Sequence, residues 1–170
     1  KSARVYFVEE PIRSDNPTGL QVETSQGVTV VTPLVRPGDS WLSPCLARFL
    51  EKIAIARPIA WYYTPLALEL GEKLRPELTV YDCMDELSAF KFAPPALKAA
   101  EAELLTRADV VFTGGQSLYE AKRRLHPDVH AFPSSVDAAH FGGARNRSEP
   151  EPEDQRKIPG PRLGYFGVID

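Results

Sequence analysis

The chain has 170 residues, of which 43% are hydrophobic and 25% are charged, values that are ordinary for a folded globular protein. Its 20 basic and 23 acidic residues give a formal net charge of −3, without the broad basic stripe that is typical of nucleic-acid-binding proteins. The one basic triplet, Lys122, Arg123 and Arg124, lies in a helical pattern, and we interpret it as a solvated face. No run approaches the roughly 18 apolar residues of a membrane span.

The first part of the chain predicts strands. Residues 4–9 (RVYFVE) are mostly β-branched and aromatic and predict one strand. Residues 21–24 and 28–32 predict a hairpin, because Ser25, Gln26 and Gly27 between them form a turn. Since the chain opens directly on a strand, we expect upstream residues to be missing.

Predicted helices and strands then alternate. The helices are expected over residues 46–56, 65–74, 94–107 and 116–125, and the strands over 59–63, 78–82, 108–113 and 129–132. This order predicts an α/β fold with a Rossmann-like, doubly wound, mainly parallel sheet. The almost continuously apolar strand at 108–113 is typical of a sheet that is covered on both faces.

The last part of the chain predicts a boundary. Residues 134–141 predict a loop, and residues 142–161 are rich in Pro, Gly and charge without an apolar period, which indicates an exposed linker. Residues 162–168 (RLGYFGV) then predict a new strand. We therefore divide the chain into a domain over 1–141, a linker over 142–161 and the first strand of a second domain over 162–170.

Carboxylates gather where a predicted strand ends. Ligands of open parallel sheets bind at the carboxyl ends of the strands, and Asp82, Asp85 and Glu86 lie there within five residues. Functionally, one of them accepts hydrogen bonds from ligand hydroxyls or acts as a base toward one. Structurally, Asp85 would cap a following helix, Asp82 would tie down the loop, and Glu86 would complement a helix N-terminus.

Two other strand ends carry polar residues. Tyr63 is the last residue of its strand, and its ring and hydroxyl suit a sugar, while Thr64 is a candidate helix N-cap. After the next but one strand, Gly114 and Gly115 either bring backbone amides toward an anion or form a tight turn that a Ser or Gln side chain caps. No GxGxxG or GxxxxGK[ST] motif is present, so no complete dinucleotide or P-loop site is visible.

Cysteines and histidines do not form a metal-binding pattern. Cys45 and Cys83 form no CxxC motif, and a reduced, cytoplasmic compartment fits them better than a disulfide does. His126, His130 and His140 are not spaced as metal ligands, and we expect surface or loop positions for them. No zinc site is therefore predicted.

Four segments resemble the family-4 type of GT-B glycosyltransferases. Residues 107–112 (RADVVF) with Ser117 resemble that family's RADxVxxxS stretch, and residues 132–137 (FPSSVD) with Phe141 are similar to its xPNGVDxxxF stretch. Residues 163–167 (LGYFG) are similar to the strand that opens its second domain. Residues 81–86 (YDCMDE) resemble the YDxxD segment of a bacterial subgroup that includes teichuronic-acid-type and other cell-surface polysaccharide transferases.

The resemblance implies two Rossmann-like domains that face a cleft, one for the acceptor and one for the nucleotide-sugar donor. It implies a retaining hexosyltransferase-like enzyme that needs no metal or cofactor, acts on a saccharide or lipid-linked acceptor of the cell envelope, binds no nucleic acid and works in the cytoplasm or at the inner membrane face. Asp85 would be catalytic. The acceptor side would be lined by Tyr63, Thr64, Asp82 and Glu86, and the interdomain cleft by Gln116, Ser117, Ser134, Ser135 and Asp137.

The chain departs from the family in three places. Ser134 and Ser135 replace an Asn-Gly pair, the family's first strand would precede Arg4, and the donor site would follow Asp170. We therefore expect this part of the enzyme to be inactive alone. The open alternatives are a non-catalytic α/β module that binds sugars or nucleotides, and a GT-B sugar-nucleotide epimerase.

Overall fold

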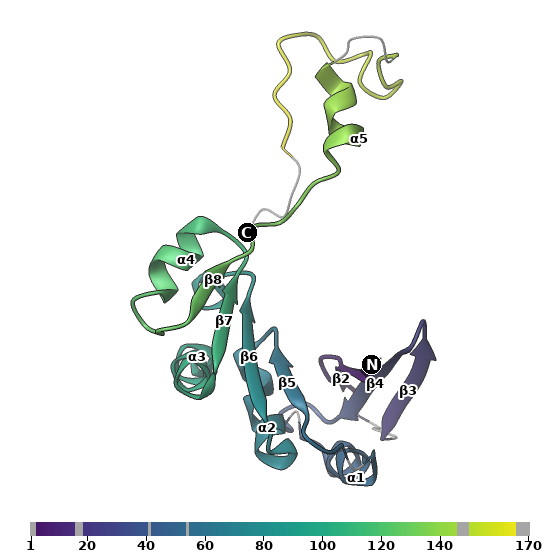
Figure 1. Ribbon diagram of the computed structural model, residues 1–170. Coiled ribbons are helices and arrows are strands. Elements are labelled where there is room, and N and C mark those ends of the chain that lie inside the picture. Colours follow the sequence, from purple (N-terminus) through teal and green to yellow (C-terminus); the bar gives the residue numbers. More distant parts are fainter. Residues whose placement is uncertain (1–2, 16–18, 41, 54, 146–149, 166–170) are drawn as a thin grey trace. The chain divides into compact units, whose positions relative to one another are not determined.

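The computed structural model describes residues 3–15, 19–40, 42–53, 55–145 and 150–165 (Figure 1). The chain forms two compact units, residues 1–132 and residues 133–170. The first unit contains every buried hydrophobic residue of the two core clusters that the structure describes. Each unit is described by itself below.

A small sheet begins the first unit. Its central strand, β4 (Val28–Val35), pairs antiparallel with β3 (Leu20–Ser25) and parallel with β1 (Val5–Val8) and β2 (Ile12–Arg13). The turn between β3 and β4 has positive φ angles of 51° at Gln26 and 82° at Gly27, which suits a two-residue hairpin. The predicted hairpin is therefore confirmed.

The second sheet is entirely parallel. Its strands are β5 (Ile59–Tyr62), β6 (Leu78–Cys83), β7 (Val110–Thr113) and β8 (Val129–Ala131), and they lie side by side in chain order (Figure 1). The α/β, Rossmann-like, mainly parallel fold is confirmed. The register places Tyr62 beside Tyr81 and Asp82 beside Phe112, so the ends of three neighbouring strands come to the same edge.

Helices alternate with these strands as predicted, although their ends differ by a few residues. They are α1 (Pro44–Ile53), the turn η1 (Pro65–Ala67) continued by α2 (Leu68–Leu74), the turn η2 (Leu87–Ala89), α3 (Ala96–Arg107) and α4 (Gln116–Lys122). Thr64 is the N-cap before Pro65, as predicted, since its Oγ1 accepts a hydrogen bond from the Leu66 amide at 3.3 Å.

One face of the parallel sheet makes the core. Tyr62, Tyr81 and Val111 are buried there together with Leu68 of α2 and Leu104 of α3. The core packs closely: a Cβ atom on Gly71 of α2 would lie 2.0 Å from the Tyr62 hydroxyl oxygen. Because glycine has no side chain, position 71 leaves room for the Tyr62 ring beneath α2.

The opposite face of the same sheet is open among the described residues. Ile59, Trp61 and Phe132 are exposed on it, and the Phe112 ring lies between Trp61 and Phe132 at centroid distances of 5.5 and 5.1 Å. The expectation of cover on both faces was therefore wrong for this part of the chain. Residues 108–113 are apolar on both faces of the strand, because Val111 faces the core and Phe112 belongs to the aromatic cluster on the open face. The sequence alone does not distinguish these two environments.

In the part of the second unit that the structure describes, the short helix α5 (Ala138–Gly142) is followed by the turn η3 (Gly143–Arg145). The loop predicted over 134–141 was therefore wrong after Asp137, which starts the helix. Residues 162–165 of the predicted final strand form no regular structure, and residues 166–168 lie outside the described residues. The division at residues 141 and 161 stays a prediction.

Candidate functional site

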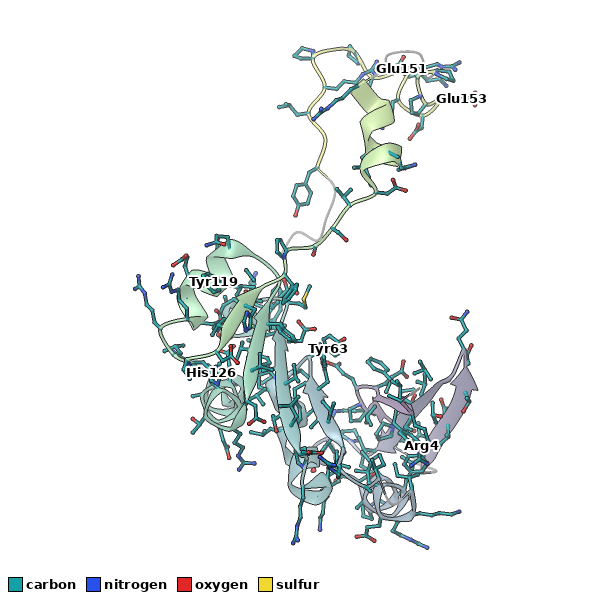
Figure 2. The ribbon with its side chains drawn as sticks, viewed as in Figure 1. Arg4, Tyr63, Tyr119, His126, Glu151 and Glu153 are labelled. Carbon is teal, nitrogen blue, oxygen red and sulfur yellow. The ribbon has the colours of Figure 1, made fainter. Side chains whose placement is uncertain are left out.

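The candidate site lies at the carboxyl edge of the parallel sheet. Three segments meet there, namely residues 63–64 after β5, residues 84–86 after β6 and residues 114–117 after β7. Figure 2 shows Tyr63 just beyond the end of its strand. The sequence prediction that these strand ends share one edge is thus confirmed by the topology.

Tyr63 presents an accessible aromatic ring. The residue is 54% exposed, and its ring packs edge-on against Phe7 at a centroid distance of 6.5 Å. Phe7 comes from β1, so this contact joins the two sheets. A ring held on one side and open on the other can stack against an apolar face of a ligand.

Asp82 is the last but one residue of β6 and is half-buried on the open face. Its Oδ2 accepts a hydrogen bond from Trp61 Nε1 at 3.1 Å. This bond fixes the indole against the sheet and leaves Oδ1 as an additional acceptor. Asp82 therefore orients a tryptophan instead of tying down the loop that follows it.

Asp85 lies in the loop after β6 and is exposed. Its backbone carbonyl accepts a hydrogen bond from the Cys83 thiol at 3.5 Å, while no hydrogen bond or ion pair of the described residues uses its carboxylate. The N-cap of the following turn η2 is Glu86, not Asp85. The carboxylate of Asp85 is thus available to a ligand, and the capping alternative does not describe it.

Glu86 is held by a buried lysine. Its two carboxylate oxygens accept hydrogen bonds from Lys122 Nζ at 3.1 and 2.9 Å, and Oε1 also accepts one from Ser88 Oγ at 3.0 Å. Burial alone would raise the pKa of Glu86, but these bonds outweigh it and lower the pKa. Glu86 therefore has a structural role, but not the predicted one at a helix N-terminus: its side chain makes no cap bond and instead anchors the loop that carries Asp85 through Lys122.

The same lysine reaches a second carboxylate. Lys122 is only 3% exposed, and its Nζ lies 2.8 Å from Oε1 of Glu101, which also accepts a 2.8 Å hydrogen bond from the Tyr81 hydroxyl. Burial would lower the pKa of Lys122, but the bonds to the two glutamates raise it. Burial raises the pKa of Tyr81, so its phenol stays protonated and donates.

This network differs from what the sequence predicts for Lys122. Lys122 was interpreted as part of a solvated basic triplet, which was wrong, because its position on α4 turns it toward α3. Glu101 carried one signal: it lies four residues after Leu97 and four before Leu105, so it shares the buried face of the helix. A carboxylate on an apolar helix face indicates a buried cationic partner.

The glycine pair after β7 has two different roles. A Cβ atom on Gly114 would lie 2.7 Å from the Met84 carbonyl oxygen, so glycine lets the two loops touch. Gly115 is the N-cap of α4 and has open space around it, without a side-chain cap bond. Gln116 and Ser117 are exposed in the first turn, where Gln116 Nε2 donates to Glu120 Oε1 at 2.8 Å. Neither side chain caps the helix as the tight-turn alternative expected.

The remaining predicted site residues belong to the second unit. Ser134 and Ser135 are exposed. Asp137 is the N-cap of α5, and its Oδ1 accepts hydrogen bonds from the Ala139 and His140 amides, each at 3.0 Å. Asp137 therefore has a clear structural role at the start of that helix.

The histidines differ from one another. His126 lies in the loop between α4 and β8, as expected, but it is buried there: its Nδ1 accepts from the Asp128 amide at 3.1 Å, and its Nε2 lies 3.0 Å from the Ala108 carbonyl oxygen, to which it donates. His130 is exposed and pairs with Asp128 at 2.7 Å. Among the described residues there is no cluster of three side chains suited to a metal ion, and none of the described helices has the length and apolarity to cross a membrane.

The sequence was also compared with known proteins. No model of a protein family matches it, and no curated protein matches it. The function therefore rests on the geometry of the site and on the sequence motifs.

Proposed function

We propose that this chain is the acceptor-side part of a glycosyltransferase that moves a sugar from a nucleotide-sugar donor to a saccharide or lipid-linked acceptor of the cell envelope. The proposal places the enzyme in the cytoplasm or at the inner face of the membrane. It rests on the resemblance in four sequence segments and on the chemistry gathered at the carboxyl edge of the sheet.

The observation that carries the proposal is the exposed carboxylate of Asp85, which follows β6 at the same edge of the sheet at which the accessible Tyr63 ring follows the neighbouring strand β5. Sugar hydroxyls donate hydrogen bonds to carboxylates, and sugar rings stack their C–H faces on aromatic side chains. Tyr63 supplies such a ring at the end of β5, and Asp82 adds an acceptor and orients Trp61. Thr64 supports the end of β5 through its cap bond.

The loop that carries Asp85 is fixed from two sides. Lys122 holds Glu86, the residue after Asp85. Gly114, in the loop after β7, allows that loop to pack against Met84, the residue before Asp85. A fixed carboxylate loses little conformational entropy when a ligand binds, which favours a defined acceptor orientation.

In the proposed reaction, the acceptor hydroxyl attacks the anomeric carbon of the donor sugar, and the bond from that carbon to the nucleoside diphosphate breaks. Asp85 accepts the hydrogen bond of the attacking hydroxyl and takes up its proton as the new glycosidic bond forms. Asp82 and Tyr63 orient the acceptor sugar. The second domain implied by the sequence resemblance would bind the donor and stabilise the departing diphosphate.

The replacement Asp85→Asn tests the role of this carboxylate in the enzyme that joins this chain to its donor-binding domain. Asparagine keeps the shape but cannot take up the proton, so we expect the transfer rate to fall about 100-fold while donor affinity stays the same. Asp154→Asn, at an exposed turn of the second unit, is the matched control and should leave the rate unchanged. Full turnover by the Asp85→Asn enzyme would remove Asp85 from the proposed mechanism.

A further inference from the structure

The connection between β6 and α3 contains a tight turn with an exposed lysine and two exposed phenylalanines. The Ala93 amide donates to the Phe90 carbonyl at 3.0 Å, so residues 90–93 form a β-turn with Lys91 and Phe92 at its corners. Phe92 is 86% exposed, more than any other large hydrophobic residue described in the first unit, and Phe90 is 49% exposed. Turn corners usually hold small or polar residues, so the turn itself does not explain an exposed phenylalanine there.

The lysine and one aromatic ring of this turn lie together. Lys91 Nζ is 5.5 Å from the centroid of the Phe92 ring, which is a cation–π distance. Within the part of the chain that the structure describes, Lys91 forms no ion pair, so its ammonium group is available to an external anion. Lys98 in the first turn of α3 is a second exposed cation that follows closely in the sequence. The turn therefore presents aromatic surface and positive charge to the solvent.

Both ends of the turn are anchored to the fold. Before it, the Ala89 amide donates to the carbonyl of Glu86 at 2.9 Å, and the Glu86 side chain is held by the buried Lys122. After it, Leu97 of α3 is buried in the core. A loop that is held at both ends keeps its tip at a defined place on the surface, and this lowers the entropy that the tip loses when it binds.

The kind and number of exposed groups match a lipid bilayer better than a protein partner. A stable protein interface buries about 1,200–2,000 Å², and a turn of four residues supplies only a small part of that area. A bilayer needs no complementary shape, and aromatic rings concentrate at its interface with water. A lysine stem lies along apolar surface while its ammonium group reaches the phosphates, and anionic lipids add attraction for each lysine. The turn thus combines the features of an interfacial anchor.

We propose that the turn at residues 90–93 inserts into the interface of a bilayer that contains anionic lipids. Phe90 and Phe92 enter the boundary between headgroups and acyl chains, and Lys91 pairs with lipid phosphates. The inference deepens the proposed function and rests on it for one consequence. Asp85 lies in the same connection between β6 and α3, so docking of the turn brings the acceptor site to the headgroup layer. The acceptor is then a lipid-linked saccharide and not a free one.

The test measures cosedimentation of the 170-residue chain with vesicles of phosphatidylcholine, with and without about 30% phosphatidylglycerol. We expect binding to be at least about fivefold stronger with the anionic lipid. Phe92→Ser should lower the partition coefficient about tenfold, and Lys91→Gln should lower it about fivefold. Leu125→Ser is the matched control, because Leu125 is also apolar and exposed, at 64%, but lies in the loop after α4. The control should bind as the wild type does.

A second readout locates the inserted residue. A tryptophan placed by Phe92→Trp should be quenched by lipids with brominated acyl chains, above the signal of the native tryptophans, whereas one placed by Leu125→Trp should not. Absence of vesicle binding, wild-type binding by Phe92→Ser, or equal quenching at both positions would each overturn the proposal.

This test is independent of sugar transfer. Asp85→Asn removes the proposed base but leaves the turn intact, so it should bind vesicles as the wild type does. If the acceptor site is wrong, Asp85→Asn will not change glycan binding or transfer, and vesicle binding through Phe92 will still be observed. If the membrane turn is wrong, the chain will still bind soluble saccharides at Asp85 but will not bind the vesicles through Phe92.

Discussion

Lys122 is the residue on which the candidate site depends most. It lies almost completely buried between Glu86 of the β6 loop and Glu101 of α3, and Tyr81 completes the network from β6. A buried ammonium group is tolerated only with such partners, because moving it from water without them is unfavourable by several kcal/mol. The network therefore fixes the position of the loop after β6 and favours the ionised form of Glu86 in that loop.

Lys122→Met tests this role. The variant leaves Glu101 buried without a cation, so we expect the free energy of unfolding to fall by about 3–5 kcal/mol. Urea denaturation measures the change. Arg123→Met is the matched control, since it removes an exposed ion pair with Glu120 and a contact of the guanidinium with the Tyr119 ring, and it should change stability by only about 1 kcal/mol or less. Similar losses in both variants would contradict the account.

Glu86 gives the stability a defined pH dependence. Its pKa is lowered from 4.5 in the folded protein, so folding favours the ionised form. The contribution is therefore present above pH 4.5 and is lost as the pH falls through the lowered pKa. We expect the difference in unfolding free energy between the wild type and Glu86→Gln to be largest near neutral pH and to shrink toward about pH 3. A difference that stays constant over this range would show that Lys122 does not select the ionised form.

At the scale of elements, the contact between the loops after β6 and β7 places Asp85. Gly114→Ala would bring a Cβ atom to 2.7 Å from the Met84 carbonyl oxygen, whereas Gly115→Ala meets open space. We expect the first variant to lose about 1–3 kcal/mol of stability and to shift the amide signals of residues 84–86 in NMR spectra. The second variant should do neither, since its backbone is extended. Identical effects would mean that the close approach is not specific to position 114.

Local sequence patterns predicted most of the elements around this contact. These elements depend on residues that are neighbours in the sequence, so the local pattern was sufficient to predict them. Examples are the alternating apolar segments, Pro65 after Thr64 and the Gly114-Gly115 turn. The network of Lys122 and Glu101 could not be predicted, because it depends on how α3 and α4 are placed relative to each other in the fold. The helix after Asp137 was missed because its five residues are too few for a clear apolar period.

At the scale of the whole molecule, the first unit combines a covered sheet face with an open one. Trp61, Phe112 and Phe132 form a contiguous aromatic cluster on the open face, and Asp82 is hydrogen-bonded to the first of them. Exposed apolar patches of this kind mark binding surfaces. The aromatic cluster on the open face thus adjoins the predicted acceptor site through the hydrogen bond between Trp61 and Asp82.

The most direct test of the central claim is saccharide binding by this chain. We would screen it against an array of oligosaccharides from bacterial capsules and cell-wall polymers, and then locate the bound glycan by NMR. We predict binding that shifts the signals of Tyr63, Asp82 and Asp85 and weakens at least about tenfold in Asp85→Asn but not in Asp154→Asn. Absence of binding to every glycan, or binding that leaves the strand ends at Tyr63 and Asp85 unaffected, would contradict the account.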